Sequence, residues 1–316
     1  MTLPFKIGHY TDLQNITGCT VILCPDQTVA SCHICGSAPG SRELALLAPD
    51  KKIDSIQALL LTGGSAFGLS AADGVMQYLE EKGVGYSTSY GLVPIVPAAV
   101  IYDLNIGSNK IRPRPENAYQ ACRNATDDFS TQGSIGAATG ATVGKWAGLK
   151  YAMKGGLGLS RIALDQAWII AVSVVNSVGD VLDTSGEIIA GAIDPDRKFL
   201  ARSRKSKFRS GLISGFGENT VLCALLTNIR LSKMQSYLLA RRGQNGLARA
   251  IVPATTSYDG DVIFCLSHGQ VDLDPEIAYE MGSEVVQMSI IESVRQAQGL
   301  GGFPAVTDLA GGTKRR

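Results

Sequence analysis

The run of residues 221–226 constrains the fold of this chain most strongly, because every position in it is apolar. A strand that faces water on one side alternates apolar and polar residues, whereas a strand covered on both sides reads as a continuous apolar run. We therefore expect a sheet that is packed on both faces. The run starts abruptly at Thr220, after the polar approach Gly217-Glu218-Asn219.

The other predicted elements alternate between strands and helices. No single strand–helix–strand period repeats, so a layered α+β sandwich fits better than a doubly wound sheet. Asp274 and Pro275 suit the N-cap and first turn of the last helix. The expected strands cover residues 19–24, 28–35 (after a turn at 25–27), 56–61, 159–164, 167–175 and 262–266, and the helices cover about 70–82, 116–128, 232–249 and 275–297.

Charge and cysteine content argue against several classes of partner and compartment. The net charge of +1 in 316 residues gives no reason to expect nucleic acid or a membrane surface as partner. No apolar run approaches the length of a membrane span, and the N-terminus lacks the apolar segment of a signal peptide. Seven cysteines, an odd number, indicate a reducing compartment rather than a disulfide scaffold. We expect a cytoplasmic protein.

Thr220 carries a potential nucleophile. If the bond between Asn219 and Thr220 were cut, Thr220 would combine a hydroxyl with a free α-amine, whose pKa is near neutrality. The alternative is a loop that enters a buried strand, and these residues alone favour that alternative. The irregular, basic stretch 194–214 lies just upstream, and we expect it to be a solvated loop in which chain separation could be tolerated.

Three familiar motifs are approached but not matched. Residues 140–146 resemble a phosphate-binding loop, but the stretch is one residue short and has Trp146 where Mg²⁺ binding requires Ser or Thr. Ser65 lies in a sequence like a nucleophile elbow whose second glycine is displaced by one, so we expect a turn residue or a backbone approach to a ligand. The cysteines and histidine between residues 19 and 35 could be imagined as zinc ligands, but core packing is favoured.

Asp259-Gly260-Asp261 precedes the predicted strand 262–266. Asp-Gly is a common hairpin-turn signal, which would leave one carboxylate solvated. The two carboxylates could instead orient an α-amine or a threonine hydroxyl. The spacing alone favours the turn.

A series of short motifs runs from Ile7 to the last predicted helix, at residues 7–12, 17–22, 38–43, 61–69, 93–104, 140–145, 175–176, 219–220 and 258–261. In this order and spacing they resemble the N-terminal-nucleophile aminopeptidases and amidases. That family includes DmpA-like L-aminopeptidase/D-amidase-esterase, β-peptidyl aminopeptidase and nylon-oligomer hydrolase. The chain departs from the pattern at Ser41, where Thr is usual, and at Glu43-Leu44-Ala45, which lack polar residues often seen there.

The resemblance implies a four-layer αββα sandwich, a single domain over residues 1–316, made as an inactive precursor. It implies self-cleavage between Asn219 and Thr220 into an α chain, 1–219, and a β chain, 220–316, which stay together. Thr220 becomes the nucleophile, and Asn176 matches the position that stabilises the oxyanion. The other matching site positions are Lys145, Asp259 and Asp261 around the nucleophile, a site tyrosine at Tyr102, and substrate-binding positions at Ser65 and Gly140.

The implied activity is hydrolysis of amide or ester bonds in small peptides or amino-acid amides, without a metal or other cofactor. The resemblance also implies a homo-oligomer, a tetramer. Two alternatives stay open at this point. One is an ornithine acetyltransferase-like acyl transferase, which shares the fold and the self-cleavage. The other is a non-catalytic small-molecule binding protein on the same fold, which the loss of Thr220 or Asn176 would have favoured.

Overall fold

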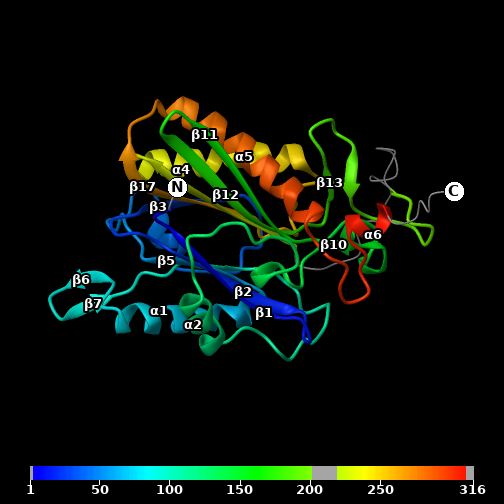
Figure 1. The fold of residues 1–316 in the computed structure, drawn as a ribbon, viewed down its shortest axis with the longest axis horizontal. Helices are drawn as coiled ribbons and strands as arrows, with labels where there is room; N and C mark the ends of the chain where they lie inside the picture. Colours follow the sequence, from blue (N-terminus) through cyan, green and yellow to red (C-terminus); the bar gives the residue numbers. More distant parts are fainter. Residues whose placement is uncertain (1–2, 201–218, 311–316) are drawn as a thin grey trace.

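The computed structural model describes residues 3–200 and 219–310. In these residues, two stacked five-stranded sheets lie between two layers of helices (Figure 1). The first sheet has the order β1 (Lys6–Asp12), β2 (Thr17–Leu23), β5 (Ala58–Thr62), β8 (Ala98–Val100) and β4 (Ser41–Arg42). The second sheet has the order β11 (Leu157–Leu164), β12 (Ala167–Asn176), β15 (Thr220–Ile229), β17 (Val262–Val271) and β3 (Val29–Ile34).

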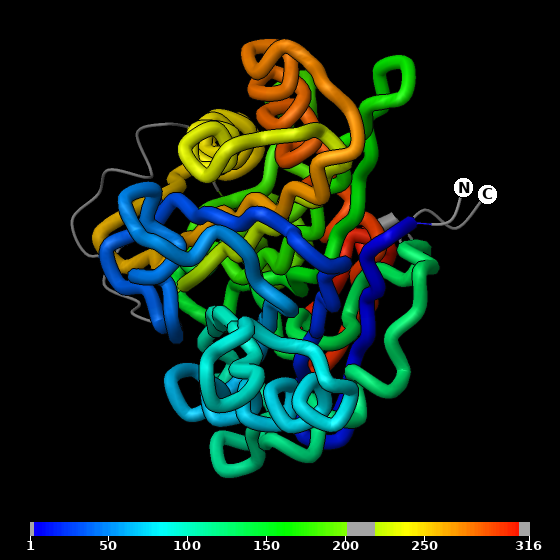
Figure 2. Tube along the Cα trace, turned by 90° about the vertical axis from the view of Figure 1, so that its left-hand side faces the viewer, coloured from blue at the N-terminus to red at the C-terminus, as the bar shows by residue number. Residues whose placement is uncertain are grey.

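Two helices cover the outer face of each sheet. Figure 2 shows α4 and α5, in yellow and orange, on one outer side of the molecule and the cyan α1 on the opposite side. The expected four-layer αββα sandwich is confirmed. The helices are α1 (Ala72–Glu81) and α2 (Pro115–Arg123) on the first sheet and α4 (Lys233–Ala250) and α5 (Pro275–Arg295) on the second, with the short α6 (Val306–Ala310) near the C-terminal end of the described chain.

The strand β15 is buried along its whole length, as its apolar run predicts. Its alternate side chains pack in different layers. Leu222 and Leu226 belong to the core between the two sheets, whereas Cys223 and Leu225 belong to the core under α4 and α5. A strand between two apolar cores needs no polar face, and this arrangement explains the unbroken run.

The turn at residues 25–27 joins two strands that do not pair with each other. β2 pairs with β1 and β5 in the first sheet, whereas β3 pairs with β17 in the second. The turn therefore carries the chain from one sheet to the other. A short sequence separation indicates neighbouring strands in many folds, but both sheets here are completed by strands from distant parts of the chain.

Most boundaries of the predicted helices are close to the observed ones, but α2 ends at Arg123 rather than near residue 128. The Asp274 side chain accepts a hydrogen bond from the Glu276 amide at 2.9 Å, and Pro275 occupies the first turn of α5, as expected. α1 starts later than predicted, because residues Ser65–Ala71 form a 3₁₀ helix first. Elements that the sequence did not indicate include the hairpin of β6 (Tyr86–Thr88) and β7 (Gly91–Val93), and the small sheet of β14 (Ile188–Ala190), β13 (Asp180–Leu182) and β16 (Ile251–Val252).

The basic stretch upstream of Thr220 is described only up to residue 200. In that part, the Arg197 guanidinium donates to the Asp308 carbonyl oxygen at 2.5 Å. The remaining basic residues, between 202 and 209, lie outside the described residues. None of the helices within residues 3–200 and 219–310 has the length and apolar character that a membrane crossing requires.

Candidate active site

Thr220 and Asn176 lie directly opposite each other at the paired ends of β15 and β12. Directly opposed residues of an antiparallel pair point to the same face of the sheet. Two positions further along each strand, Leu222 and Val174 belong to the core between the sheets. The Thr220 and Asn176 side chains therefore emerge at the edge of the space between the two sheets, and both residues are buried. The structure brings together two residues that the sequence analysis assigned to the same site.

The side-chain amide of Asn176 is held from two sides. Its Oδ1 accepts from Lys145 Nζ at 2.8 Å and from the Thr142 amide at 3.0 Å. Its Nδ2 donates to the Tyr102 carbonyl oxygen at 3.1 Å. An amide nitrogen carries two hydrogens, so Asn176 can still offer one donor to a further oxygen. Because Asn176 Oδ1 accepts from Lys145 and from both the amide and the hydroxyl of Thr142, the remaining Nδ2 donor is held in place before any substrate arrives.

Lys145 begins the 3₁₀ helix η4 (Lys145–Ala147), directly after Gly144. Gly144 has φ of +75°, and a Cβ there would lie 2.2 Å from the Ala192 amide nitrogen, so the tight entry requires glycine. Lys145 Nζ also donates to the Asn176 main-chain oxygen at 3.1 Å. Burial lowers the pKa of Lys145 to about 7, although the nearby Asp259 acts in the opposite direction. A lysine with such a pKa can accept a proton at neutral pH.

Asp259 and Asp261 are both buried, each about 2% exposed, at the entrance to β17. The expected hairpin turn with a solvated carboxylate is therefore wrong, because the segment leads into a strand that runs parallel to β15 and is covered by residues 35–38. Asp261 Oδ1 accepts from the Val221 amide at 2.7 Å. Burial, and then the charge of Asp259, raise the pKa of Asp261. The alternative, in which the carboxylates orient an α-amine or a threonine hydroxyl, stays a prediction, and Asp261 binds the residue that follows Thr220.

Asp259 has one engaged and one open carboxylate oxygen. Its Oδ2 accepts from the Thr256 amide at 2.6 Å, whereas its Oδ1 has no hydrogen-bond partner among the described residues. Burial raises the pKa of Asp259, and the hydrogen bonds from Thr256 and the charge of Lys145 oppose this effect. A buried acceptor without a partner costs free energy, so an incoming ammonium group would be bound favourably there.

Tyr102 contributes its main-chain carbonyl to the site, through the bond from Asn176 Nδ2. The next residue, Asp103, was not singled out in the sequence, yet it is 2% exposed and holds the surrounding loops. Its Oδ2 accepts from Thr17 Oγ1 at 2.7 Å, and its Oδ1 accepts from the Gly64 amide at 2.7 Å. Burial raises the pKa of Asp103. The indication in the sequence was the position of Asp103 directly after Tyr102, within the family motif at residues 93–104.

Ser65 and Gly140 lie around Asp103 rather than in contact with Asn176. Ser65 has φ of +53°, and its amide donates to the Ile101 carbonyl at 3.0 Å, so it is a turn residue, as one of its two readings proposed. A Cβ on Gly140 would lie 2.6 Å from Asp103 Cβ. Glycine is required there for close packing. A substrate-binding role for either residue stays a prediction.

A second buried lysine, Lys154, was not expected from the sequence. It lies in the short strand β10 (Met153–Lys154), and its Nζ donates to the Thr139 and Ala141 carbonyls at 2.9 and 2.5 Å. Burial lowers its pKa to about 7, while Asp103 opposes the shift. The one signal in the sequence is a lysine within an otherwise apolar and glycine-rich stretch, 152–159.

The cysteines are packing residues, as favoured. All seven are free thiols, and Cys19 and Cys32 lie in the cores of different layers. Burial raises the pKa of Cys32 to about 12, so its thiol is protonated at neutral pH. Within residues 3–200 and 219–310, no group of three or more His, Cys, Asp or Glu side chains is arranged to hold a metal ion.

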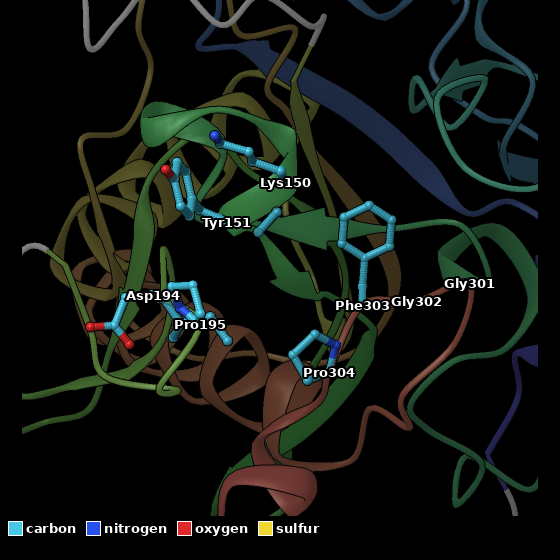
Figure 3. Close-up of a pocket in the computed structure, with 10 residues that line it drawn as sticks. Lys150, Tyr151, Asp194, Pro195, Gly301, Gly302, Phe303 and Pro304 are labelled. Atoms are coloured by element: carbon cyan, nitrogen blue, oxygen red, sulfur yellow. The ribbon is translucent and has the colours of Figure 1, made fainter.

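A separate cavity of about 390 Å³ lies next to the 3₁₀ helix η5 (Leu149–Tyr151), which contributes Lys150 and Tyr151 to its lining. Figure 3 shows Tyr151 on one side of it and Phe303 and Pro304 on the other. None of the described residues that line this cavity belongs to the group around Thr220. It is therefore distinct from the candidate active site.

Comparison with known proteins identifies the family. The model of Peptidase family S58 matches residues 5–307. An uncharacterized aminopeptidase of Mycobacterium leprae is 35% identical, over 95% of this chain and 90% of its own length. A 6-aminohexanoate-oligomer endohydrolase of Kocuria sp. is 30% identical, over 84% of this chain and 73% of its own length.

A solved structure agrees in fold. The L-aminopeptidase D-Ala-esterase/amidase of Ochrobactrum anthropi, described as a variant of the N-terminal-nucleophile hydrolase fold, superposes with a TM-score of 0.73 at 16% identity. The match covers 96% of this chain and 86% of that one. Since the family match spans nearly the whole chain, this protein belongs to Peptidase family S58 and is a hydrolase of the aminopeptidase kind.

Proposed function

We propose that the chain cuts itself between Asn219 and Thr220 and then hydrolyses amide or ester bonds with Thr220 as its nucleophile. Its substrates are small peptides or amino-acid amides and esters. The observation that carries this proposal is the placement of Thr220 directly opposite Asn176, whose side chain Lys145 holds at 2.8 Å. This placement supports a site in which a nucleophile, an oxyanion donor and a group able to accept a proton act together.

The two chains, 1–219 and 220–316, stay together because they share the second sheet. β15 and β17 belong to the β chain, and they pair with β12 and β3 of the α chain. The cores on both sides of this sheet also mix residues of the two chains. Separation would expose both cores to water, which is strongly unfavourable.

In the first stage, the Thr220 hydroxyl oxygen attacks the carbonyl carbon of Asn219. The new C–O bond replaces the C–N bond, and the hydroxyl proton passes to the nitrogen, which gives an ester and a free α-amine. Water then hydrolyses the ester, which restores the hydroxyl and leaves Asn219 as a C-terminal carboxylate. The β-branched threonine favours the attack because its side chain occupies few rotamers.

In the second stage, the freed α-amine of Thr220, or Lys145 with its pKa of about 7, accepts the hydroxyl proton. The oxygen attacks the substrate carbonyl carbon, and the remaining Asn176 donor stabilises the negative charge that develops on the carbonyl oxygen. Collapse of this intermediate breaks the substrate C–N or C–O bond, and the leaving amine or alcohol takes the proton from the base. Water then hydrolyses the acyl ester on Thr220, which releases the acid and restores the hydroxyl. Asp259 and Asp261 are placed to orient the α-amine of Thr220 or the ammonium group of the substrate. The open Oδ1 of Asp259 supports this role.

The test is the intact mass of the purified protein, followed by assays on a substrate panel. We expect two fragments, 1–219 and 220–316, and activity on some of aminoacyl p-nitroanilides, D-amino-acid amides, β-peptides and ω-amino-acid oligomers. A single uncut chain that still hydrolyses amides would overturn the mechanism. The same preparation should not transfer acetyl groups from acetylornithine to glutamate at a comparable rate, since that activity would identify an acyl transferase.

We also propose that the protein works as a homo-oligomer in the cytoplasm. The seven free thiols suit a reducing compartment. Light scattering coupled to size-exclusion chromatography gives the mass of the assembly, and a monomer would contradict the proposed oligomer. Cell fractionation tests the compartment.

A further inference from the structure

Asn219, the last residue before the proposed cut, is bound through both of its main-chain polar groups. Its amide donates to the Tyr258 carbonyl oxygen at 3.3 Å, and its carbonyl oxygen accepts from the Gly260 amide at 2.7 Å. Asn219 and Asp259 thus form an isolated parallel bridge just before the paired region of β15 and β17. The carbonyl that Thr220 would attack is held in place by a donor.

Gly260 also lies against the proposed nucleophile. A Cβ added to Gly260 would lie 2.9 Å from Thr220 Oγ1 and 2.6 Å from the Ala38 carbonyl oxygen. Both distances are shorter than Cβ contacts in folded proteins allow, and the second neighbour is backbone. Only glycine at position 260 leaves the Thr220 hydroxyl its present position.

We propose that Gly260 is a catalytic residue of the self-cleavage reaction. Its main-chain N–H stabilises the oxyanion that forms on the Asn219 carbonyl, and its missing side chain leaves room for the attacking hydroxyl. This inference rests on the self-cleavage proposed above. It assigns the oxyanion of the first stage to Gly260, whereas Asn176 serves substrate turnover in the second stage.

The chemistry requires such a donor at this position. When Thr220 Oγ bonds to the Asn219 carbonyl carbon, the C=O electron pair moves to the oxygen, which becomes negatively charged. Collapse of this intermediate breaks the C–N bond and sends the proton to nitrogen. A donor aimed at the oxygen on which the charge develops stabilises it without reorganisation. In the uncut chain the Gly260 amide donates to that oxygen, the Asn219 carbonyl oxygen, at 2.7 Å.

The direct test removes the N–H and adds no side chain. Replacing Gly260 by glycolic acid, through nonsense suppression in cell-free synthesis of the full chain, converts the amide to an ester that cannot donate. We expect self-cleavage, followed on a denaturing gel over time, to slow by about 10²–10³-fold, the usual effect of losing one oxyanion donor. The matched control is the same replacement at Gly246 in α4, which lies against Ser283 of α5. Cleavage at the wild-type rate after replacement of Gly260 would overturn the inference.

A second variant tests the space beside Thr220. Gly260→Ala should block cleavage more strongly than Gly246→Ala. The Cβ of Gly246→Ala would lie 2.0 Å from the Ser283 carbonyl oxygen, so this variant would disturb only the packing between helices. If both alanine variants lose cleavage in proportion to their loss in thermal stability, the role of Gly260 is structural and the inference is wrong.

Hydroxylamine identifies the step that is affected. It cleaves esters, so it would complete cleavage in a chain that is arrested after the acyl shift. We expect no rescue of Gly260→Ala, because the shift itself is slowed, and rescue would overturn the inference. The glycolic acid variant is left out of this assay, because hydroxylamine would also cleave its backbone ester at position 260. An uncut wild-type chain would contradict the proposed function itself, whereas a normal wild type beside rapidly cleaved Gly260 variants contradicts only the role of Gly260.

Discussion

Two buried lysines offer the most informative comparison in this molecule. Lys145 and Lys154 are 3% and 0% exposed, and burial lowers the pKa of each to about 7. Their hydrogen-bond partners differ. Lys145 binds the side chain of Asn176, which faces Thr220, whereas Lys154 binds the carbonyl oxygens of residues 139 and 141.

The carboxylate near each lysine differs in the same way. Both oxygens of Asp103, near Lys154, accept hydrogen bonds from Thr17 and Gly64. Asp259, near Lys145, keeps one oxygen without a partner among the described residues. A saturated cluster stabilises loops, whereas an unsaturated cluster can receive a substrate or a new amine. A shifted pKa alone therefore does not distinguish a catalytic lysine from a structural one. We expect the hydrogen-bond partners of the lysine and of its neighbouring carboxylate to distinguish them.

The largest expected effect comes from replacing Thr220, the proposed nucleophile. Thr220→Ala should stay uncut and lose activity by roughly 10⁴-fold or more, because both stages need the hydroxyl. Intact mass and amide hydrolysis measure the two effects. Thr220→Ser is the control, since it keeps a hydroxyl and should still cut. Retained activity in the uncut alanine variant would redirect attention to Ser65.

The next effect separates the two lysines by rate. Lys145→Met should reduce kcat/KM by about 10²–10⁴-fold, the range for a lost acid–base group, whereas Lys154→Met should change it less than about tenfold per folded molecule. Wild-type activity should also rise with pH through about 7, as Lys145 becomes neutral. Equal losses in the two variants would contradict the distinction drawn between these sites.

For Lys154 we expect a clear effect on the free energy of unfolding, although its effect on activity is small. Lys154→Met leaves the carbonyl oxygen of Thr139 without the Lys154 donor, whereas the carbonyl oxygen of Ala141 keeps its hydrogen bond from the Gly155 amide at 2.9 Å. We expect the free energy of unfolding to fall by about 1–3 kcal/mol at pH 9, where the wild-type lysine is neutral and still donates. Urea denaturation in the Thr220→Ala background, which we expect to stay a single chain, measures this change. An unchanged urea midpoint would show that the stability of the fold does not depend on Lys154.

The pH dependence of stability sharpens the same point. The pKa of Lys154 is about 7 in the folded chain and near 10.5 in the unfolded one, so the unfolded state binds more protons between these values. Stability from this lysine therefore rises with pH from about 7 to 10.5, by up to about 1.4 kcal/mol per unit. The difference in free energy of unfolding between the wild type and Lys154→Met should therefore grow in favour of the wild type as the pH rises from 7 to 9. A difference that does not vary with pH would indicate an ordinary lysine pKa.

The smallest effect is expected for an exposed lysine. Lys51 pairs with Asp50 at the surface. Exposed ion pairs contribute little because water screens them and the side chains lose entropy. Lys51→Met should leave the melting temperature and the activity unchanged within error, and a clear loss would contradict the view that burial makes the other two lysines important.

Much of the fold could be predicted because burial leaves a clear pattern. The apolar run 221–226, the caps of α5 and the order of elements indicated a layered α+β sandwich. The partners of each strand could not be predicted in this way. β2 and β3 are adjacent in sequence, yet they belong to different sheets, because pairing depends on which faces the distant strands leave open.

The sequence by itself determined which residues could carry the chemistry: Thr220 at the start of a buried strand, and Asn176 and Lys145 through their place in a family pattern. Only the tertiary structure decided what these residues contact. The register between β12 and β15 places Asn176 opposite Thr220, and the parallel neighbour β17 buries Asp259 and Asp261 where their sequence alone indicated a solvated turn. Burial, hydrogen bonding and charge shifts arise from groups far apart in the chain, so no local pattern contains them.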